Sequence, residues 1–295
     1  MRIQTDSDPV PRITLRDGNT IPQLGFGTLA VQPDRESSDA NAETTGQIVR
    51  QALEAGYRHI DTAQSYGTER GVGRAIAESG IPRDELYIAS KLANDNHAPD
   101  DVRRSVDQTL ANLGVEQLDL FLIHWPLPTL YGGDYVSTWT TLTELVAEGR
   151  LRSAGVSNFQ PAHLDRLVAE TGIAPLVNQF ELHPYFANAD ACEASRRHGI
   201  AIEAHSPLGH NREPLTDETI TRIATAHGKS TAQVILRWHV QRGDIAIPKS
   251  TRPERMRENI AVFDFELAPE EMASIDALDR GANGRVGPNP DTWEG

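Results

Sequence analysis

The chain has 295 residues, of which 38% are hydrophobic, with a formal net charge of −14 and a single cysteine, Cys192. Its length and hydrophobic content allow a large core, in one domain of barrel size or in two smaller ones. The acidic charge argues against nucleic acid as the main partner, because duplex binding needs a basic face. One cysteine excludes an internal disulfide, which favours a reducing compartment.

The first ten residues, MRIQTDSDPV, contain no apolar segment of the kind that secretory signals carry. No apolar run elsewhere in the sequence is long enough to span a bilayer. We therefore expect a cytoplasmic protein without a membrane partner, with a flexible tail over residues 1–10.

After this tail the sequence predicts a β-hairpin, because Asp17, Gly18 and Asn19 form a turn signal between two short alternating segments. Eight short apolar segments predict strands at 23–27, 59–63, 86–92, 118–125, 152–158, 176–182, 201–207 and 244–250. Between them lie segments of helical period at 44–56, 69–80, 100–114, 137–149, 161–172, 190–199 and 217–228, most of which end in glycine. Three further helices are predicted over 230–243, 253–263 and 268–281.

Strands that alternate with helices indicate a parallel sheet, and eight such units predict an α/β fold of the (β/α)8 TIM barrel type. An open doubly wound sheet is the competing architecture, and it would carry a glycine-rich loop directly after an early strand. The only near match, GVGRAI from Gly71, lies inside a predicted helix and lacks the third glycine, so we assign it to helix packing. Residues 11–295 are therefore expected to form one barrel domain.

Polar side chains occur at nearly every predicted strand end, which is where barrel enzymes carry their active sites. The second strand ends in Asp61, with Tyr66 in the following loop; the third ends in Lys91 and the fourth reaches His124. The later strand ends carry Ser157, Asn158, Gln179, His183, His205, Ser206, Lys249 and Ser250.

The residues Asp61, Tyr66, Lys91 and His124 form a coherent acid–base set. A free tyrosine has a pKa of about 10, too high for efficient proton transfer near neutral pH. A lysine ammonium about 4 Å away would stabilise the phenolate by up to roughly 4 kcal/mol, which corresponds to about three pKa units. Asp61 would keep the lysine charged, and His124 would donate a hydrogen bond to a substrate oxygen. The alternative is a buried Asp–Lys pair with a tyrosine and a histidine that only pack nearby.

Six motifs in chain order resemble the successive signatures of the aldo-keto reductase family, from about Ile13 to Trp293: HIDTAQSYG, IASKL, LIHWP, GVSNF, NQFELHPY and IPKS…RMREN. The closing NGRVGPNPDTW resembles the bacterial diketogluconate-reductase branch. The resemblance implies a monomeric barrel that reduces a small carbonyl substrate with NADPH, forming NADP+. Tyr66 would be the general acid, Lys91 and Asp61 its tuning pair, and His124 the donor that orients the carbonyl.

The same resemblance implies a cofactor site at the strand ends. An amide is recognised by groups that donate and accept, which suits Ser157, Asn158 and Gln179 at the nicotinamide carboxamide. Cations and hydroxyls suit the 2′-phosphate of NADPH. These phosphate residues would be Lys249, Ser250, Thr251 and Arg255, with Glu258 and Asn259 at the adenine and Thr28, Ser206 and Leu208 as further cofactor contacts. On composition alone, KSTRPERMREN is an exposed basic start of a helix, which is the alternative.

His205 departs from the family pattern, in which an aromatic residue stacks on the nicotinamide. A neutral imidazole can still stack, but a protonated one would lie against the positive charge of oxidised nicotinamide. We therefore expect NADP+ binding to weaken below about pH 6.5, the ordinary pKa of histidine.

The substrate pocket also has fewer aromatic residues than is usual in the family. Leu29 and Ala93 occupy two positions that are often aromatic, which leaves Trp125; we expect Leu29 and Trp125 to contact the substrate. Three aromatic residues in flanking loops, Tyr131, Tyr135 and Trp293, are candidates to refill the wall.

Two other functions remain open on the sequence. One is a metal-dependent barrel hydrolase, because four histidines lie near strand ends, namely His59, His124, His183 and His205. The His-x-His pair that such enzymes usually carry is missing, so we expect no metal. The other is a regulatory protein that binds the cofactor but turns over slowly.

Overall fold

The computed structural model describes residues 10–210 and 213–295. Most of the tail predicted over residues 1–10 lies outside the described residues. Its last residue, Val10, is buried within the core.

Eight parallel strands form a closed barrel, in the order β10-β9-β8-β7-β6-β5-β4-β3. Closure comes from Leu24, which bridges Ala246, and from the N–H groups of Gly25 and Gly27, which donate to Ala246 O at 2.9 Å and Pro248 O at 3.0 Å. The strands are β3 (Phe26–Gly27), β4 (His59–Asp61), β5 (Tyr87–Leu92), β6 (Leu118–Ile123), β7 (Leu151–Ser157), β8 (Val177–Glu181), β9 (Ala201–His205) and β10 (Ile245–Ile247). The predicted (β/α)8 fold is confirmed.

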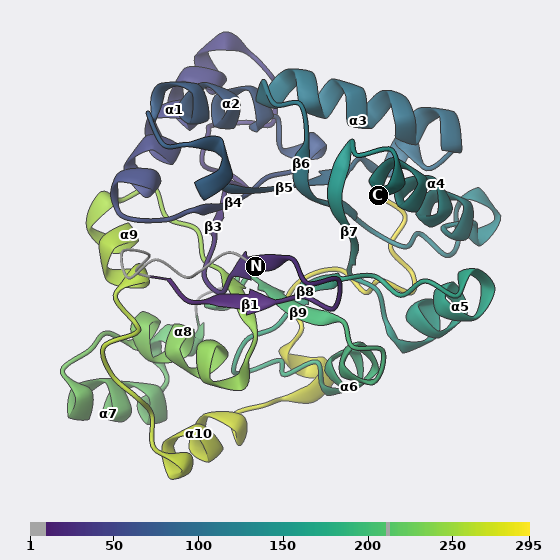
Figure 1. Ribbon diagram of the computed structural model, residues 1–295. Helices are drawn as coiled ribbons and strands as arrows, with labels where there is room; N and C mark the ends of the chain where they lie inside the picture. The colour runs from purple at the N-terminus through teal and green to yellow at the C-terminus, as the bar shows by residue number, and fades with distance from the viewer. Residues whose placement is uncertain (1–9, 211–212) are drawn as a thin grey trace.

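Ten α-helices of the described chain surround the barrel (Figure 1). They are α1 (Asp39–Glu54), α2 (Glu69–Glu78), α3 (Pro99–Leu113), α4 (Val136–Ala147), α5 (Pro161–Thr171), α6 (Ala189–Arg197), α7 (Glu218–His227), α8 (Thr231–Arg242), α9 (Pro253–Ile260) and α10 (Pro269–Asp276). In the described ranges, none of these helices combines the length and the apolar character needed to cross a bilayer.

The glycines of the GVGRAI stretch allow close helix packing, as the sequence predicted. A Cβ on Gly71 would lie 2.4 Å from Cβ of Thr45 in α1, and one on Gly73 would lie 2.6 Å from the carbonyl oxygen of Asn112 in α3. Helix α2 can therefore approach both of its neighbours only with glycine at these two positions.

The predicted N-terminal hairpin covers one opening of the barrel (Figure 1). Strands β1 (Arg12–Thr14) and β2 (Thr20–Pro22) pair antiparallel. Leu15 and Ile21 of the hairpin pack into an apolar cluster with residues from the barrel strands, namely Tyr87, Ala89, Leu120, Leu122, Val177, Ile245 and Ile247. This closes the opening at the starts of the strands, so the opposite opening carries the polar strand ends.

Candidate active site

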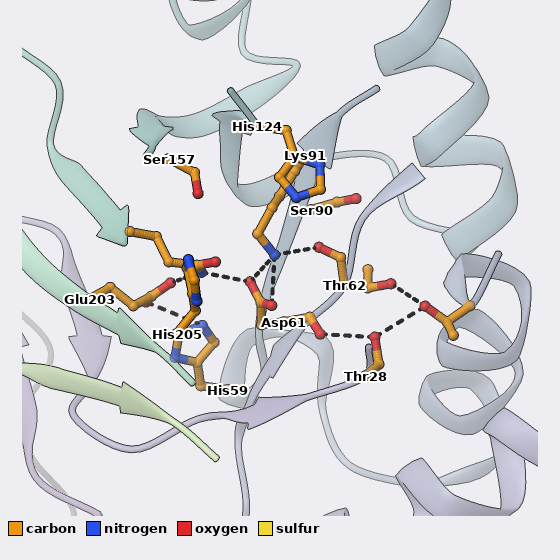
Figure 2. Close-up of polar contacts among 12 residues, drawn as sticks. Thr28, His59, Asp61, Thr62, Ser90, Lys91, His124, Ser157, Glu203 and His205 are labelled. Atoms are coloured by element: carbon orange, nitrogen blue, oxygen red, sulfur yellow. Dashed lines mark hydrogen bonds and ion pairs between the residues drawn. The ribbon is translucent and has the colours of Figure 1, made fainter. Parts of the chain in front are cut away.

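Lys91 of β5 is fully buried, and its ammonium group lies among oxygen atoms from the end of β4 and from Thr62, the next residue (Figure 2). Its Nζ atom donates to both carboxylate oxygens of Asp61 at 2.7 Å and to the carbonyl oxygen of Thr62 at 3.0 Å. Asp61 and Lys91 reach each other because β4 and β5 are adjacent parallel strands. The predicted Asp61–Lys91 pair is therefore present.

Tyr66 lies in a short 3-10 turn, Gln64–Tyr66, that the protein holds at several points. The Gln64 amide donates to Ser105 O and Thr109 Oγ1, both at 2.9 Å, and accepts from Ala93 N at 2.7 Å. Gly67 ends the turn with a φ of 71°, which favours glycine. These contacts fix the backbone of the turn from which the Tyr66 side chain extends.

The Lys91 Nζ lies 5.0 Å from the centre of the Tyr66 ring. Burial raises the pKa of Tyr66 above its ordinary value of 10.0, while Lys91 acts to lower it. Burial alone would lower the pKa of Lys91, but Asp61 and Tyr66 together raise it above 10.5. The net shift of Tyr66 is thus opposite to the lowering predicted from the sequence, because burial has the larger effect. At neutral pH Tyr66 carries its proton and Lys91 its charge.

His124 lies beside Tyr66, with ring centres 5.6 Å apart and an angle of 72° between the rings. Burial lowers the pKa of His124 well below 6.5, and the nearby Lys91 lowers it further. The imidazole is therefore neutral near pH 7 and can donate one N–H. The four predicted catalytic residues are brought together by the fold.

A hydrogen-bonded row of side chains follows at the ends of β7 and β9. Asn158 donates to His124 O at 2.9 Å and to Ser157 Oγ at 3.1 Å. Its Oδ1 lies 3.1 Å from His205 Nε2, and His205 Nδ1 lies 3.2 Å from Ser206 Oγ. Because the Asn158 oxygen can only accept, Nε2 of His205 carries the proton.

The expected pH threshold for His205 is wrong. Burial lowers the pKa of His205 to about 4, and Glu181 only partly opposes this shift. The ring is therefore neutral at pH 6.5 and stays neutral well below it. A positive imidazole would form only near pH 4 and below.

Gln179 of β8 connects this row to the buried pair. Its amide donates to Asp61 Oδ2 at 3.0 Å and also to Oε1 of Glu203. Burial raises the pKa of Glu203 to about 8, with Asp61 adding to the shift. His59 Nε2 lies 3.9 Å from Glu203, but burial lowers the pKa of His59 to about 3, so this contact is not an ion pair at neutral pH.

The predicted phosphate residues lie on the connection from β10 to α9. The hydroxyl of Ser250 accepts from Arg252 N at 3.1 Å, immediately before the helix. Lys249, Thr251 and Arg255 are exposed around this helix start, whereas Asn259 is buried and Glu258 half-buried on the helix itself. A helix N-terminus with exposed cations is suited to an anion.

Two further predicted cofactor residues have other contacts in the structure. The Thr28 hydroxyl is buried. It donates to Asp61 O at 3.0 Å and lies 3.1 Å from Thr68 Oγ1. Leu208 is partly buried against two apolar clusters. The structure therefore shows a hydrogen-bonding role for Thr28 and a packing role for Leu208, and their contact with a cofactor stays a prediction.

Among the candidate aromatic residues, Trp293 is the one next to Trp125, with ring centres 5.8 Å apart. Tyr135 is buried against Phe159 instead, and the exposed Tyr131 stacks on His97. The suggestion that Tyr135 refills the pocket wall is therefore wrong. Leu29 and Ala93 are both half-buried.

Several residues of the site were not found from the sequence. A charged residue inside an apolar strand was the available signal for Glu203 and for Glu181 of β8. Gln64 gave no signal, since its partners lie on α3 and after β5, far from it in the sequence. No group of three or more histidine, cysteine, aspartate or glutamate side chains in residues 10–210 and 213–295 is arranged to hold a metal ion.

Comparisons with known proteins agree with this geometry. The Aldo/keto reductase family profile matches residues 23–280. An aldo-keto reductase of Mycolicibacterium smegmatis is 47% identical over 283 residues, covering 96% of this chain and 98% of the relative. Morphine 6-dehydrogenase of Pseudomonas putida is 42% identical over 292 residues, covering 95% and 94%.

A solved structure, a mutant of Gox0644 in complex with NADPH, superposes with a TM-score of 0.88 at 40% identity, covering 96% of this chain and 98% of the other. The resemblance to the diketogluconate-reductase branch stays a prediction. The profile match and the identities over almost the whole chain show that the protein is an oxidoreductase of the aldo/keto reductase family.

Proposed function

We propose that the protein reduces an aldehyde or ketone to the alcohol with NADPH, with Tyr66 as the proton donor. The observation that carries the proposal is the buried Lys91, paired with Asp61 at 2.7 Å and 5.0 Å from the Tyr66 ring. A cation buried beside a tyrosine at the mouth of a barrel is suited to stabilise negative charge that develops on the phenol oxygen.

Four side chains have separate roles at the substrate carbonyl. Tyr66, protonated at neutral pH, donates its proton to the carbonyl oxygen as that oxygen gains negative charge. Lys91 stabilises the phenolate that remains, and Asp61 keeps Lys91 charged. His124 is neutral and donates a hydrogen bond that orients the same oxygen.

The donor set at the strand ends fits a nicotinamide dinucleotide phosphate. The Ser157 hydroxyl can donate to a carboxamide and the side-chain oxygens of Asn158 and Gln179 can accept from it, whereas the NH2 groups of these two amides already donate within the protein. His205 presents a neutral ring beside them. The start of α9 would hold the 2′-phosphate, through Lys249, Ser250, Thr251 and Arg255. When bound, the cofactor supplies the hydride. The NADPH complex of Gox0644 supports this assignment, and Leu29 and Trp125 are proposed substrate contacts.

The decisive variant is Tyr66→Phe, which removes only the phenol oxygen. Removing a general acid lowers turnover by a factor on the order of 10²–10⁴, so kcat with a reactive aldehyde should fall by at least that range while NADPH still binds. The measurement is NADPH oxidation at 340 nm, with NADPH affinity followed by fluorescence. A variant with nearly the wild-type kcat would refute Tyr66 as the proton donor.

A single-turnover experiment separates an enzyme from a slow cofactor-binding regulator. Protein loaded with NADPH is mixed with excess aldehyde, and the loss of bound NADPH is followed in time. The proposed function requires oxidation of the bound cofactor within seconds. Bound NADPH that persists across dicarbonyls, aromatic aldehydes, sugars and ketosteroids would favour the regulatory role.

A further inference from the structure

Glu181, at the end of β8, is a buried carboxylate that takes no part in the proposed chemistry. Its Oε1 accepts from the N–H of Val286 and its Oε2 from the N–H of Gly287, both at 2.7 Å. His183 Nε2 lies 3.0 Å from Oε1. Burial alone would raise the pKa of Glu181, but these three contacts lower it to about 2. The carboxylate therefore holds two consecutive peptide groups of the C-terminal segment.

The C-terminal segment is closely fitted to the residues around Glu181. A Cβ on Gly284 would lie 1.7 Å from the carbonyl oxygen of Tyr185, and one on Gly287 would lie 2.7 Å from Glu181 Oε2. The guanidinium of Arg285 lies 4.5 Å from the centre of the Phe186 ring. Residues 284–287 are thus seated without space for a larger side chain at either glycine.

The chain between Gly287 and Trp293 is stiff. Pro288 and Pro290 have fixed φ angles, which removes two of the rotations that would decouple the ends of this segment. The N–H of Trp293 donates to Asn289 O at 2.9 Å, which closes a turn just before the indole. The position of Trp293 therefore depends on the place where Gly287 is held, together with the contact of Asp291 Oδ1 with His163 Nε2 at 3.5 Å.

Trp293 in turn lies against Trp125, with an angle of 47° between the rings. We propose that Glu181 is a positioning residue for the substrate site: by holding Val286 and Gly287 it sets Trp293 against Trp125 and favours carbonyl substrates with an aromatic body. This rests on the proposed function, because the two indoles form a substrate wall only if the carbonyl is reduced beside Tyr66.

We call the contact of the Glu181 carboxylate with the N–H groups of Val286 and Gly287 the clamp. Two variants disturb it, one on each side of the contact. Glu181→Leu removes both acceptors at similar volume, and Gly287→Ala adds a methyl group that would meet Glu181 Oε2 at 2.7 Å. Glu266→Leu is the matched control, because Glu266 is exposed. Thermal unfolding of each variant shows whether the barrel is intact, and Gly287→Ala serves if Glu181→Leu does not fold.

The kinetic experiment compares kcat/KM for 2-naphthaldehyde with kcat/KM for propanal at saturating NADPH. In both clamp variants kcat/KM should fall about tenfold for the aromatic aldehyde and less than about twofold for propanal. In a Trp293→Ala background, Glu181→Leu should cause no further loss of kcat/KM for the aromatic aldehyde. Equal losses on both aldehydes, or losses that multiply in the double variant, would show that Glu181 does not act through Trp293.

A spectroscopic arm does not depend on turnover. Near-ultraviolet circular dichroism reports the coupling of two indoles, with Trp125→Phe and Trp293→Phe as references. The coupled indole band should be missing from the spectra of both clamp variants, as it is from the spectra of Trp125→Phe and Trp293→Phe. A folded Glu181→Leu protein that keeps this band overturns the proposal. A wild-type protein inactive on both aldehydes would count against the proposed function, while this arm still decides the role of Glu181.

Discussion

Lys91 is charged although it has no exposure to solvent. Burying an ammonium group costs several kcal/mol, and the cost is offset only when acceptors surround it. Asp61 supplies two of these acceptors and the Thr62 carbonyl a third. The same pair that tunes the proposed acid therefore also determines whether the barrel interior tolerates the charge.

Asp61→Asn should destabilise the protein as well as impair catalysis. The variant leaves Lys91 buried without a counter-ion, which typically costs about 3–5 kcal/mol of unfolding free energy. Urea denaturation followed by circular dichroism measures the loss. Adding Lys91→Met should recover much of it, since the unpaired charge is gone; a double variant less stable than Asp61→Asn alone would contradict this reasoning.

Between pH 5.5 and 8, protonation of His205 should not change the affinity for NADP+. The pKa of His205 is lowered to about 4 by burial, so its ring gains a proton only in stronger acid. Fluorescence titration across this range should give parallel profiles for the wild type and His205→Trp. A wild-type affinity that alone weakens near pH 6.5 would show that His205 is protonated there.

At this scale the sequence predicted which residues meet but not their energetics. Motif spacing placed Asp61, Tyr66, Lys91 and His124 at adjacent strand ends, and the fold brings them together. The direction of the Tyr66 shift was wrong because a distance argument contains the lysine charge but not the degree of burial. Burial depends on side chains from many elements, so it was accessible only from the fold.

At the level of secondary-structure elements, the connection from β10 to α9 is the proposed binding site for the 2′-phosphate. It joins a buried strand to a helix whose first turn is surrounded by exposed cations. A phosphate at this position would gain from the side chains and from the positive end of the helix dipole.

Replacing Lys249 or Arg255 by alanine should therefore raise KM for NADPH by about tenfold while KM for NADH stays nearly constant, because only NADPH carries the 2′-phosphate. Arg257→Ala is the matched control, since Arg257 is an exposed cation in the last turn of the same helix. The measurement is steady-state kinetics with both cofactors. An equal increase for NADPH and NADH would refute the phosphate role.

Element boundaries show where sequence patterns lose information. Helix α1 begins at Asp39, five residues before the predicted start at position 44, because Ser38 caps it by accepting from Asn41 N. The first barrel strand was predicted over 23–27 but covers only Phe26–Gly27. Leu24 and Gly25 contact Ala246 through an isolated bridge and one hydrogen bond, which do not extend the strand. Such partners are distant in sequence and leave no local pattern.

For the whole molecule, Glu203 makes stability depend on pH. Its pKa rises from 4.5 to about 8 on folding, so the favourable contribution of its neutral form is complete below pH 4.5 and is lost as pH rises through 8. Glu203→Gln should therefore gain stability relative to the wild type between pH 5 and 8.5, by roughly 3–4 kcal/mol.

Urea unfolding at several pH values measures this difference, and groups common to both proteins cancel in it. Glu266→Gln, which changes an exposed glutamate, should run parallel to the wild type at every pH. A constant difference between Glu203→Gln and the wild type would show that Glu203 is ionised in the folded protein throughout.

The closure of the barrel between Leu24 and Ala246 has a consequence for synthesis on the ribosome. While the chain emerges, β3 presents an unpaired edge until β10, near the other end of the sequence, has been made. An open strand edge is a template for pairing with other chains. The nascent protein thus spends most of its translation with this edge exposed, so truncation before β10 should yield aggregates, and chaperones that shield strand edges should act until the last strand arrives.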